Sequence, residues 1–241
     1  MTTFAAVLAQ RLRQDPGKPL VTFYDHATGE RVELSTTTWA NWVAKAGSLL
    51  VDELGLERGD RIAVDLPPHW LGTVFLGAAW SAGLAVVPVD DGGLAAVVCG
   101  PDTLARWAPE AGDLVVLACA LLPLGVRFAE PLPAGVHDVG VEIWSQPDAF
   151  TPWDPPTPDD LAYAGPGAGV GLDQAALWTA AAAGRLSGGG RLLSVADPVT
   201  EPMTLSEPLA LGGSLVLVAR AEPHELEATS VAEHVTARFP A

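Results

Sequence analysis

Residues 84–99 read LAVVPVDDGGLAAVVC, in which two short apolar runs, 84–87 and 95–99, flank an acidic turn that contains two glycines. Both runs lack the alternation of polar and apolar residues that marks a strand with one solvated face. Strands that are apolar on both faces are typical of a parallel sheet covered by helices on both sides. The stretch therefore predicts an α/β fold with parallel or mostly parallel sheets.

The same pattern extends in both directions along the chain. Further short apolar strands are predicted at residues 20–24, 31–34, 62–64, 114–118, 161–164, 192–195 and 214–218. Segments with apolar positions three or four residues apart predict helices at residues 36–54, 69–82, 172–185, 203–211 and 225–237, with a helical turn at 101–107. Alternation of helices and strands is what a covered parallel sheet requires.

A proline-rich stretch interrupts this alternation. Helix is excluded there by Pro147, Pro152, Pro155, Pro156 and Pro158. We expect a first α/β subdomain at residues 1–145, a linker at 146–158, and a second α/β segment at 159–241 that packs on the first within one compact domain.

The net charge of -16 limits the classes of partner. Lys18 and Lys45 are the two lysines of the sequence, and an acidic surface repels phosphate backbones and anionic lipid. We therefore expect no binding to nucleic acid or membranes, and a partner that is an unknown small molecule or protein. Cys99 and Cys119 stand in apolar surroundings and are expected to be buried, reduced thiols of a cytoplasmic protein.

Residues 70–89 carry no charge and are long enough to cross a bilayer, but their composition favours another interpretation. Gly83 breaks the run, Pro88 closes it, and aspartates rather than basic anchors follow it. A buried helix, a glycine break and a buried strand are predicted instead. Residues 1–14 show no apolar run ahead of a cleavage site, so no secretory signal is expected.

Five segments stand out in chain order. They are ELSTTTWAN at 33–41, GLERGDRIA at 55–63, WSAGLAVVPVD at 80–90, DDLAY at 159–163 and LALGGSLVLV at 209–218. In this order they resemble the front part of the adenylate-forming, AMP-binding enzymes, which include acyl-CoA synthetases, firefly luciferase and the adenylation domains of peptide synthetases. The resemblance implies the large-domain fold of that family, with helices around parallel sheets. It does not by itself imply the activity.

The sequence departs from the family at the loop that follows the strand at 161–164. In the family this loop has the form Thr-Ser-Gly-Thr-Thr-Gly-x-Pro-Lys-Gly and holds the phosphates of ATP. Residues 165–172 here read GPGAGVGL, with neither a hydroxyl nor a lysine. The resemblance assigns a degenerate nucleotide loop, in which backbone N–H groups reach an anion at the start of a helix from Leu172, to five residues: Tyr163, Gly165, Gly167, Gly169 and Gly171.

This departure decides the expected function. Nucleotidyl transfer depends on positive charge placed where the transition state gathers negative charge, and no lysine follows Lys45. We expect a pseudoenzyme: a truncated, non-catalytic relative that keeps a scaffold for a ligand or partner at the carboxyl ends of its strands. No catalytic residue or metal ligand is assigned, and ATP or AMP is the cofactor that the resemblance implies.

Two alternatives stay open. One is a structural or assembly module that binds no small molecule. The other is an acyl-adenylating subunit, of the acid–thiol ligase type, completed by a second polypeptide that supplies the lysine and the metal ligand.

Other polar residues are expected to be structural. His137 and Asp138 are interpreted as a solvated pair in a loop at 133–140. A charged helix face, rather than a metal site, explains the histidines and glutamates near the end of the chain, namely His224, Glu225, Glu227, Glu233 and His234.

The tryptophans divide into two groups. Trp39, Trp42 and Trp80 fall on apolar helical faces and are expected in the core. Trp144 and Trp153 flank the proline-rich stretch, where we expect them to pack this segment onto the domain; the alternative is that they line a groove or a partner surface.

Overall fold

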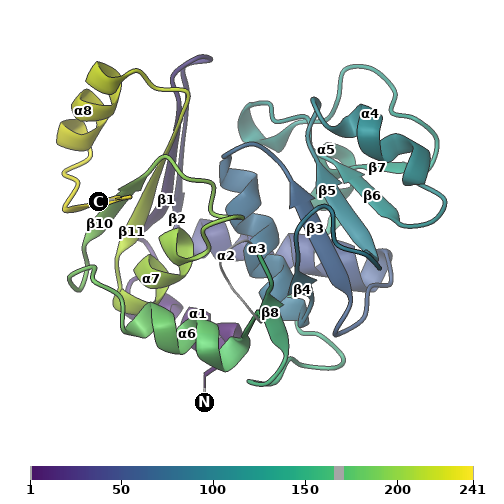
Figure 1. Ribbon diagram of the computed structural model, residues 1–241, viewed down its shortest axis with the longest axis horizontal. Helices are drawn as coiled ribbons and strands as arrows, with labels where there is room; N and C mark the ends of the chain where they lie inside the picture. Colours follow the sequence, from purple (N-terminus) through teal and green to yellow (C-terminus); the bar gives the residue numbers. More distant parts are fainter. Residues whose placement is uncertain (1, 166–170, 241) are drawn as a thin grey trace. The chain divides into compact units, whose positions relative to one another are not determined.

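The computed structural model describes residues 2–165 and 171–240, and its contacts divide the chain into two compact units. Unit 1 comprises Met1–Ala40, Pro68–Thr73 and Ala175–Ala241, and unit 2 comprises Asn41–Pro67 and Val74–Gln174. Each unit is built on its own mostly parallel sheet with helices against it (Figure 1). The α/β class predicted from the apolar strands is thus confirmed.

Unit 1 contains a five-stranded sheet in the order β12-β10-β11-β1-β2. Its strands are β1 (Pro19–Asp25), β2 (Glu30–Ser35), β10 (Arg191–Ser194), β11 (Ser214–Ala219) and β12 (Ala237–Phe239). The β1–β2 pair is antiparallel, and the other pairs of this sheet are parallel. Helices α1 (Phe4–Gln14), α7 (Met203–Leu211) and α8 (Pro223–Ala232) belong to the same unit, with most of α6 (Gln174–Ala182).

Successive side chains of β10 and β11 point to opposite faces of this sheet, and both faces are apolar. Leu193, Val216 and Val218 form one buried cluster, against which Leu226 of α8 packs. Helix α7 packs on β10 and β11 as well, and α1 packs on α7. The predicted pattern of strands that are apolar on both faces is therefore present, with all six residues of β11 buried.

Unit 2 contains a seven-stranded sheet in the order β7-β6-β5-β3-β4-β8-β9. Its strands are β3 (Arg61–Asp65), β4 (Ala85–Val86), β5 (Ala96–Cys99), β6 (Val115–Ala118), β7 (Val136–Asp138), β8 (Leu161–Tyr163) and β9 (Leu172–Asp173). The β8–β9 pair is antiparallel and the other pairs are parallel. The short segments of this unit are η1 (Leu49–Glu53), α4 (Leu104–Trp107), η2 (Ala108–Glu110), η3 (Pro123–Gly125), α5 (Val139–Glu142) and η4 (Ile143–Ser145).

Two long helices, α2 (Thr36–Ser48) and α3 (Trp70–Ala82), contribute residues to both units. In unit 2, α3 buries Trp80 completely, and the Trp80 indole Nε1 donates to the Ala162 carbonyl at 3.1 Å. The uncharged run at 70–89 is therefore a buried helix followed by the short strand β4, as predicted. Within residues 2–165 and 171–240, no helix combines the length and the apolar character that crossing a membrane requires.

Several boundaries differ from the sequence predictions. Residues 133–140 were predicted as a loop, but Val136–Asp138 form β7, because they pair in parallel with β6. The helix predicted at 225–237 ends at Ala232; His234 then adopts a left-handed φ of 51°, and β12 adds to β10. The helix α1 had no sequence prediction. The helix predicted at 36–54 ends in a π-helical turn, η1.

The contacts group the chain differently from the predicted segments 1–145, 146–158 and 159–241. The proline-rich stretch lies wholly inside unit 2, and the first and last parts of the chain share unit 1. The physical reason is strand pairing, because β1 near the amino end pairs with β11 near the carboxyl end. The predicted segmentation as folding units stays a prediction.

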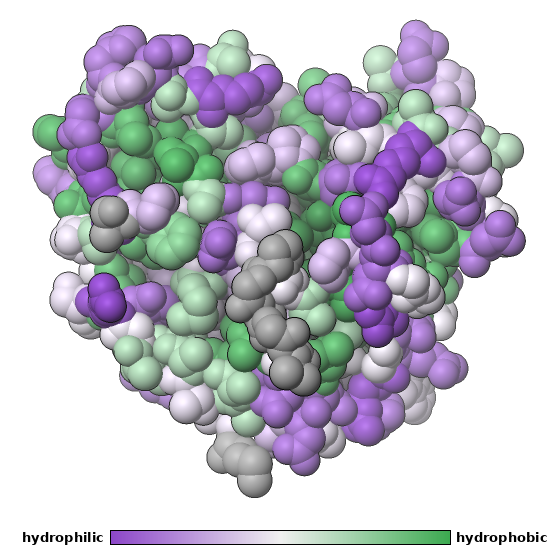
Figure 2. Space-filling view, in the orientation of Figure 1, coloured by the Kyte–Doolittle hydropathy of each residue, from purple (hydrophilic) through white to green (hydrophobic). Residues whose placement is uncertain are grey.

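Hydrophilic and hydrophobic residues are interspersed over the face drawn in Figure 2.

Two glycines with left-handed backbones allow a matched stability test in unit 2. Gly55 (φ 73°) and Gly83 (φ 74°) share the conformation, but a Cβ at Gly55 would meet nothing within 4 Å. A Cβ at Gly83 would lie 2.7 Å from Cγ of Arg58 and 3.2 Å from Cβ of Pro156. We expect Gly55→Ala to lower the free energy of unfolding by about 1–2 kcal/mol, and Gly83→Ala by about 1–3 kcal/mol more. Urea denaturation measures both, and equal losses would contradict the packing at Gly83.

The two thiols allow a second test. Cys99 and Cys119 are free and buried, as predicted. Burial raises the pKa of Cys99 to about 12 and the pKa of Cys119 well above its ordinary value. Because the thiolate is the reactive form, we expect an aromatic disulfide reagent to label neither thiol at pH 8 in the folded protein and both thiols in urea. Fast labelling of the native chain would show that this core opens.

Candidate functional site

The loop that the sequence singled out connects two antiparallel strands at one edge of the sheet in unit 2. Tyr163 ends β8, and Leu172 begins β9 opposite it. Of the five residues assigned to the degenerate nucleotide loop, Tyr163, Gly165 and Gly171 are described, whereas Gly167 and Gly169 lie outside the described residues. The assignment itself stays a prediction.

Tyr163 folds back over the start of this loop. Its side chain is 4% exposed, and a Cβ on Gly165 would lie 1.9 Å from the Tyr163 hydroxyl oxygen. Gly171, at the other end, has a φ of 87°, and a Cβ there would lie 2.8 Å from Leu161 Cδ1. Glycine is thus required at both described ends for close packing and backbone conformation, which explains two glycines of the loop without a ligand.

The helix after the loop begins later than predicted. The sequence predicted a helix from Leu172, but Leu172 and Asp173 pair with β8 as the strand β9, and α6 begins at Gln174. The Gln174 backbone N–H donates to the Asp160 carbonyl at 2.9 Å, and its side-chain amide donates to the Trp80 carbonyl at 3.0 Å.

This correction matters for anion binding. An anion at a helix start needs free N–H groups and the positive end of the helix dipole. Here the N–H of Gln174 already has an acceptor in the chain, and Asp173 places a carboxylate directly before the helix. The arrangement favours a helix start that is satisfied internally.

Both lysines have acidic partners within the chain. Lys18 lies 2.7 Å from the carboxylate of Asp15, and Lys45 lies 3.1 Å from that of Asp148.

A site for a ligand or partner was expected at the carboxyl ends of the parallel strands, and the sheet of unit 2 has one such edge. At this edge, Asp65 ends β3 in the middle of the sheet. The Trp107 indole donates to the Asp65 carboxylate at 2.6 Å, and the Thr103 hydroxyl donates to its carbonyl at 2.9 Å. Arg106 stacks over the Trp107 ring at 4.6 Å. The chain's own side chains thus occupy the polar groups of Asp65.

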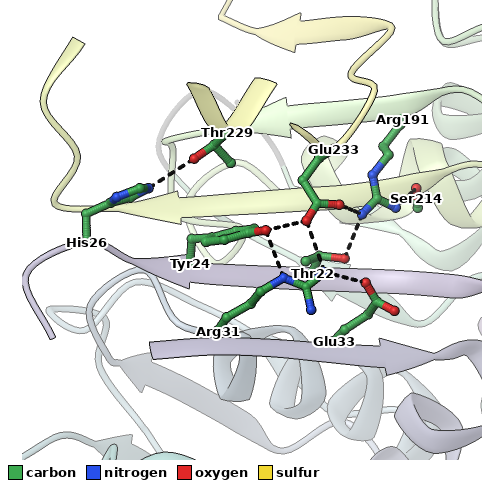
Figure 3. A network of polar contacts seen from close by, with 9 residues as sticks. All are labelled: Thr22, Tyr24, His26, Arg31, Glu33, Arg191, Ser214, Thr229 and Glu233. Carbon is green, nitrogen blue, oxygen red and sulfur yellow. Dashed lines mark hydrogen bonds and ion pairs between the residues drawn. The ribbon is translucent and has the colours of Figure 1, made fainter. Parts of the chain in front are cut away.

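A network of polar side chains lies on the sheet of unit 1 and centres on Glu233, the residue that caps the end of α8 (Figure 3). Glu233 accepts hydrogen bonds from the Tyr24 hydroxyl and from the guanidinium groups of Arg31 and Arg191. Arg191 also donates to the Thr22 hydroxyl at 2.9 Å. Strands β1, β2 and β10 therefore all hold the carboxylate that ends the last helix.

Charge balance explains why Glu233 stays ionised there. Desolvation raises the pKa of this partly buried carboxyl, but the hydrogen bonds from Tyr24, Arg31 and Arg191 together hold its pKa below the ordinary value. Sequence reasoning missed this network because Arg191 and Glu233 are 42 residues apart and meet only through β12 and β10. The polar side chains of Thr22 and Tyr24 within an otherwise apolar strand were the available signal.

The other predicted polar residues have structural roles. The His137 Nδ1 lies 3.1 Å from the Glu142 carboxylate, and Asp138 accepts from the backbone N–H of Gly140 at 2.9 Å, capping α5. His137 and Asp138, which were expected to be a solvated pair in a loop, thus lie at the end of a strand, and Asp138 caps a helix.

The charged residues of α8 are engaged separately. Glu227 pairs with Arg238, and Glu225 accepts from the Glu222 N–H in a capping box. Within the described residues, no three histidines, cysteines or carboxylates converge as a metal site would require.

The tryptophans are distributed partly as predicted. Trp39 and Trp80 are fully buried, whereas Trp42 is half-buried and packs edge-on against Trp144 at 5.3 Å. The expectation that Trp153 packs the proline-rich stretch onto the domain is wrong, because its side chain is 92% exposed.

A family model and one relative each match most of this chain. The model of the AMP-binding enzyme family matches residues 8–163. A Mycobacterium tuberculosis protein, named only by a numbered family, is 38% identical over 98% of this chain and 97% of its own length.

Solved structures share the fold at low identity. An acyl-CoA synthetase from Brucella canis superposes with a TM-score of 0.78 at 17% identity, over 98% of this chain and 47% of its own. Coronafacic acid ligase from Pectobacterium brasiliense gives a TM-score of 0.76 at 16% identity, over 99% and 49%. The chain thus spans about half the length of these two enzymes.

The Glu233 network generates a pH test. Because the folded-state pKa of Glu233 is lowered, its contribution is present above the unfolded pKa and is lost as pH falls through the folded pKa. We expect Glu233→Gln to lower the free energy of unfolding by about 1–3 kcal/mol at pH 7. The difference from the parent should shrink towards zero as the pH is lowered below about 4.

Glu227→Gln is the matched control, because it removes an exposed carboxylate of the same helix. Thermal unfolding of both variants between pH 3 and pH 7 makes the comparison. A Glu233→Gln loss that stayed constant with pH would show that the carboxylate charge is not what holds the helix end.

Proposed function

Because this chain belongs to the AMP-binding enzyme family, we propose that it is a non-catalytic member, whose sheets serve as a scaffold for binding a ligand or partner. The observation that carries the proposal is the composition of residues 165–172, GPGAGVGL, which contains no hydroxyl and no lysine. The activities of the longer enzymes it resembles are not transferred to it.

The energetic reason is the charge that develops on the phosphates during adenylate formation. Loss of one donor that faces such charge commonly costs about 3–4 kcal/mol in transition-state stabilisation, and this loop lacks several together. A backbone of glycines retains N–H groups, which can contact an anion but do not supply a full positive charge.

The surroundings of the loop support the same proposal. Gln174 has its backbone N–H bonded within the chain, Asp173 places a negative charge at the helix start, and Tyr163 covers the backbone of Gly165. Each of these features disfavours a bound triphosphate. We further propose a cytoplasmic location, in line with two free and buried cysteines.

The proposal predicts that the purified chain catalyses no ATP–pyrophosphate exchange with fatty, aromatic or amino acids. Exchange of radiolabelled pyrophosphate into ATP is the measurement, with a known acyl-CoA synthetase in the same mixture as the positive control. Exchange that depends on an added carboxylic acid and exceeds the protein-free blank would overturn the proposal that the chain is non-catalytic.

A thermal-shift screen with ATP, AMP, CoA and fatty acids separates a binding scaffold from a purely structural module. A ligand present at about a hundred times its Kd stabilises the fold by roughly 2.7 kcal/mol. We expect stabilisation by at least one ligand of the panel. No response to any of them would favour the structural module, and exchange that appears only with a co-purifying chain would favour the completed-enzyme alternative.

A further inference from the structure

Trp153 is placed unlike the other large apolar residues of the described chain. Its side chain is 92% exposed, against 53% for Trp144 and 0% for Trp80. Indole carries a large apolar surface, and full exposure of that surface is unfavourable in water. Tryptophan is also among the residue types enriched where protein interfaces carry most of their binding energy.

The backbone around Trp153 is fixed rather than free. Pro152 precedes it directly, and Pro155 and Pro156 follow after Asp154, which restricts the backbone on both sides. The Arg58 guanidinium donates to the Pro155 carbonyl at 3.1 Å and to the Asp154 carboxylate at 3.2 Å. The indole is thus presented by a rigid segment, which lowers the entropy cost of binding.

A hollow of about 360 Å³ adjoins the indole within unit 2. Val51, Leu56 and Ala82 contribute apolar surface to it, together with Pro152 and Trp153. The π-helical turn η1, in which the Leu54 N–H donates to the Leu49 carbonyl at 3.0 Å, carries Val51 to this wall. The hollow can take the aliphatic part of a side chain while its end reaches the rim.

The charge at the rim is negative. Glu57 and Asp154 line the hollow, and Arg58, the cation among its described lining residues, is paired with Asp154 and lies 3.7 Å from Asp160. Two carboxylates, Asp154 and Asp160, thus lie beside this guanidinium, and Glu57 is a further carboxylate of the lining. The whole chain adds a net charge of -16, and residues 145–160 contain four aspartates without a lysine or arginine. The complementary group is a cation.

We propose that Trp153 and the adjoining hollow form a docking surface for a basic segment of a partner protein. An arginine or lysine side chain would stack on the indole face and place its charge beside Glu57 and Asp154. Cation–π contacts of this kind are strongest with tryptophan, and the excess negative charge favours the encounter. Trp153 lies outside residues 163–171, so this docking holds whether or not the chain binds a nucleotide or forms adenylates.

The probe is a short synthetic peptide of alternating arginine and glycine, titrated into the full-length protein at about 0.15 M ionic strength, where the Debye length is about 8 Å. The indole N–H signals in a ¹H–¹⁵N spectrum report binding to the parent, and Trp153→Ala identifies the signal of Trp153. Isothermal titration calorimetry gives the affinity of the parent and of each variant. We expect a saturable shift of that signal and at least a tenfold loss of affinity in Trp153→Ala. Trp153→Phe should retain part of the affinity.

Trp144→Ala is the matched control, because it removes another exposed indole of the same unit, and it should leave the affinity unchanged. Glu57→Gln should weaken binding without removing the aromatic face. Unfolding curves are recorded for all variants. The curve of Trp153→Ala should coincide with that of the parent, since the Trp153 side chain is exposed.

Three results would overturn the proposal. Equal affinity in the parent and Trp153→Ala would show that the peptide senses net charge alone. Tighter binding of an uncharged proline-rich peptide would assign the surface to another class of partner. A concentration-dependent shift of the Trp153 signal without peptide, with none on its addition, would assign it to a second copy of this chain.

Discussion

The parallel pairing of β1 with β11 is the contact on which unit 1 depends. It aligns Val21 with Leu215 and continues to Asp25 and Ala219, so it joins residues from the two ends of the chain. Arg11 strengthens this closure, because its buried guanidinium donates to the Gly213 carbonyl at 2.9 Å. Pairing at such sequence separation costs loop-closure entropy, which the complete burial of β11 offsets. The polar network around Glu233 then attaches the end of α8 to this sheet.

Electrostatics connects this architecture to the proposed function. In a chain of net charge -16, cations are scarce, and the fold uses many of them to neutralise its own carboxylates. These ion pairs include Lys18–Asp15, Lys45–Asp148, Arg58–Asp154, Arg191–Glu233 and Arg220–Asp25. These cations are therefore paired with carboxylates of the chain. The chain has the sheets of its family, but residues 165–172 include no charged side chain that could hold a phosphate.

Two tryptophans show how the same residue type can stand in a core or at a surface. Trp80 is completely buried, and its indole N–H has the Ala162 carbonyl as acceptor, so its contribution is to the core. Trp153 is 92% exposed on a proline-flanked segment that Arg58 holds. The proposed binding role of the proline-rich stretch would give the chain a contact surface that is independent of the loop at residues 165–171.

The sequence by itself determined the α/β class, most strands, the buried helix within 70–89 and the loss of charge in the loop, because hydrophobic periodicity and composition are local properties. Only the tertiary structure decided which strands meet. The pairing that makes β7 and β12 strands, the start of α6 at Gln174, and the Arg191–Glu233 contact all depend on residues far apart in the chain. The exposure of Trp153 was likewise undetermined, since burial is a property of the assembled chain and not of the residue.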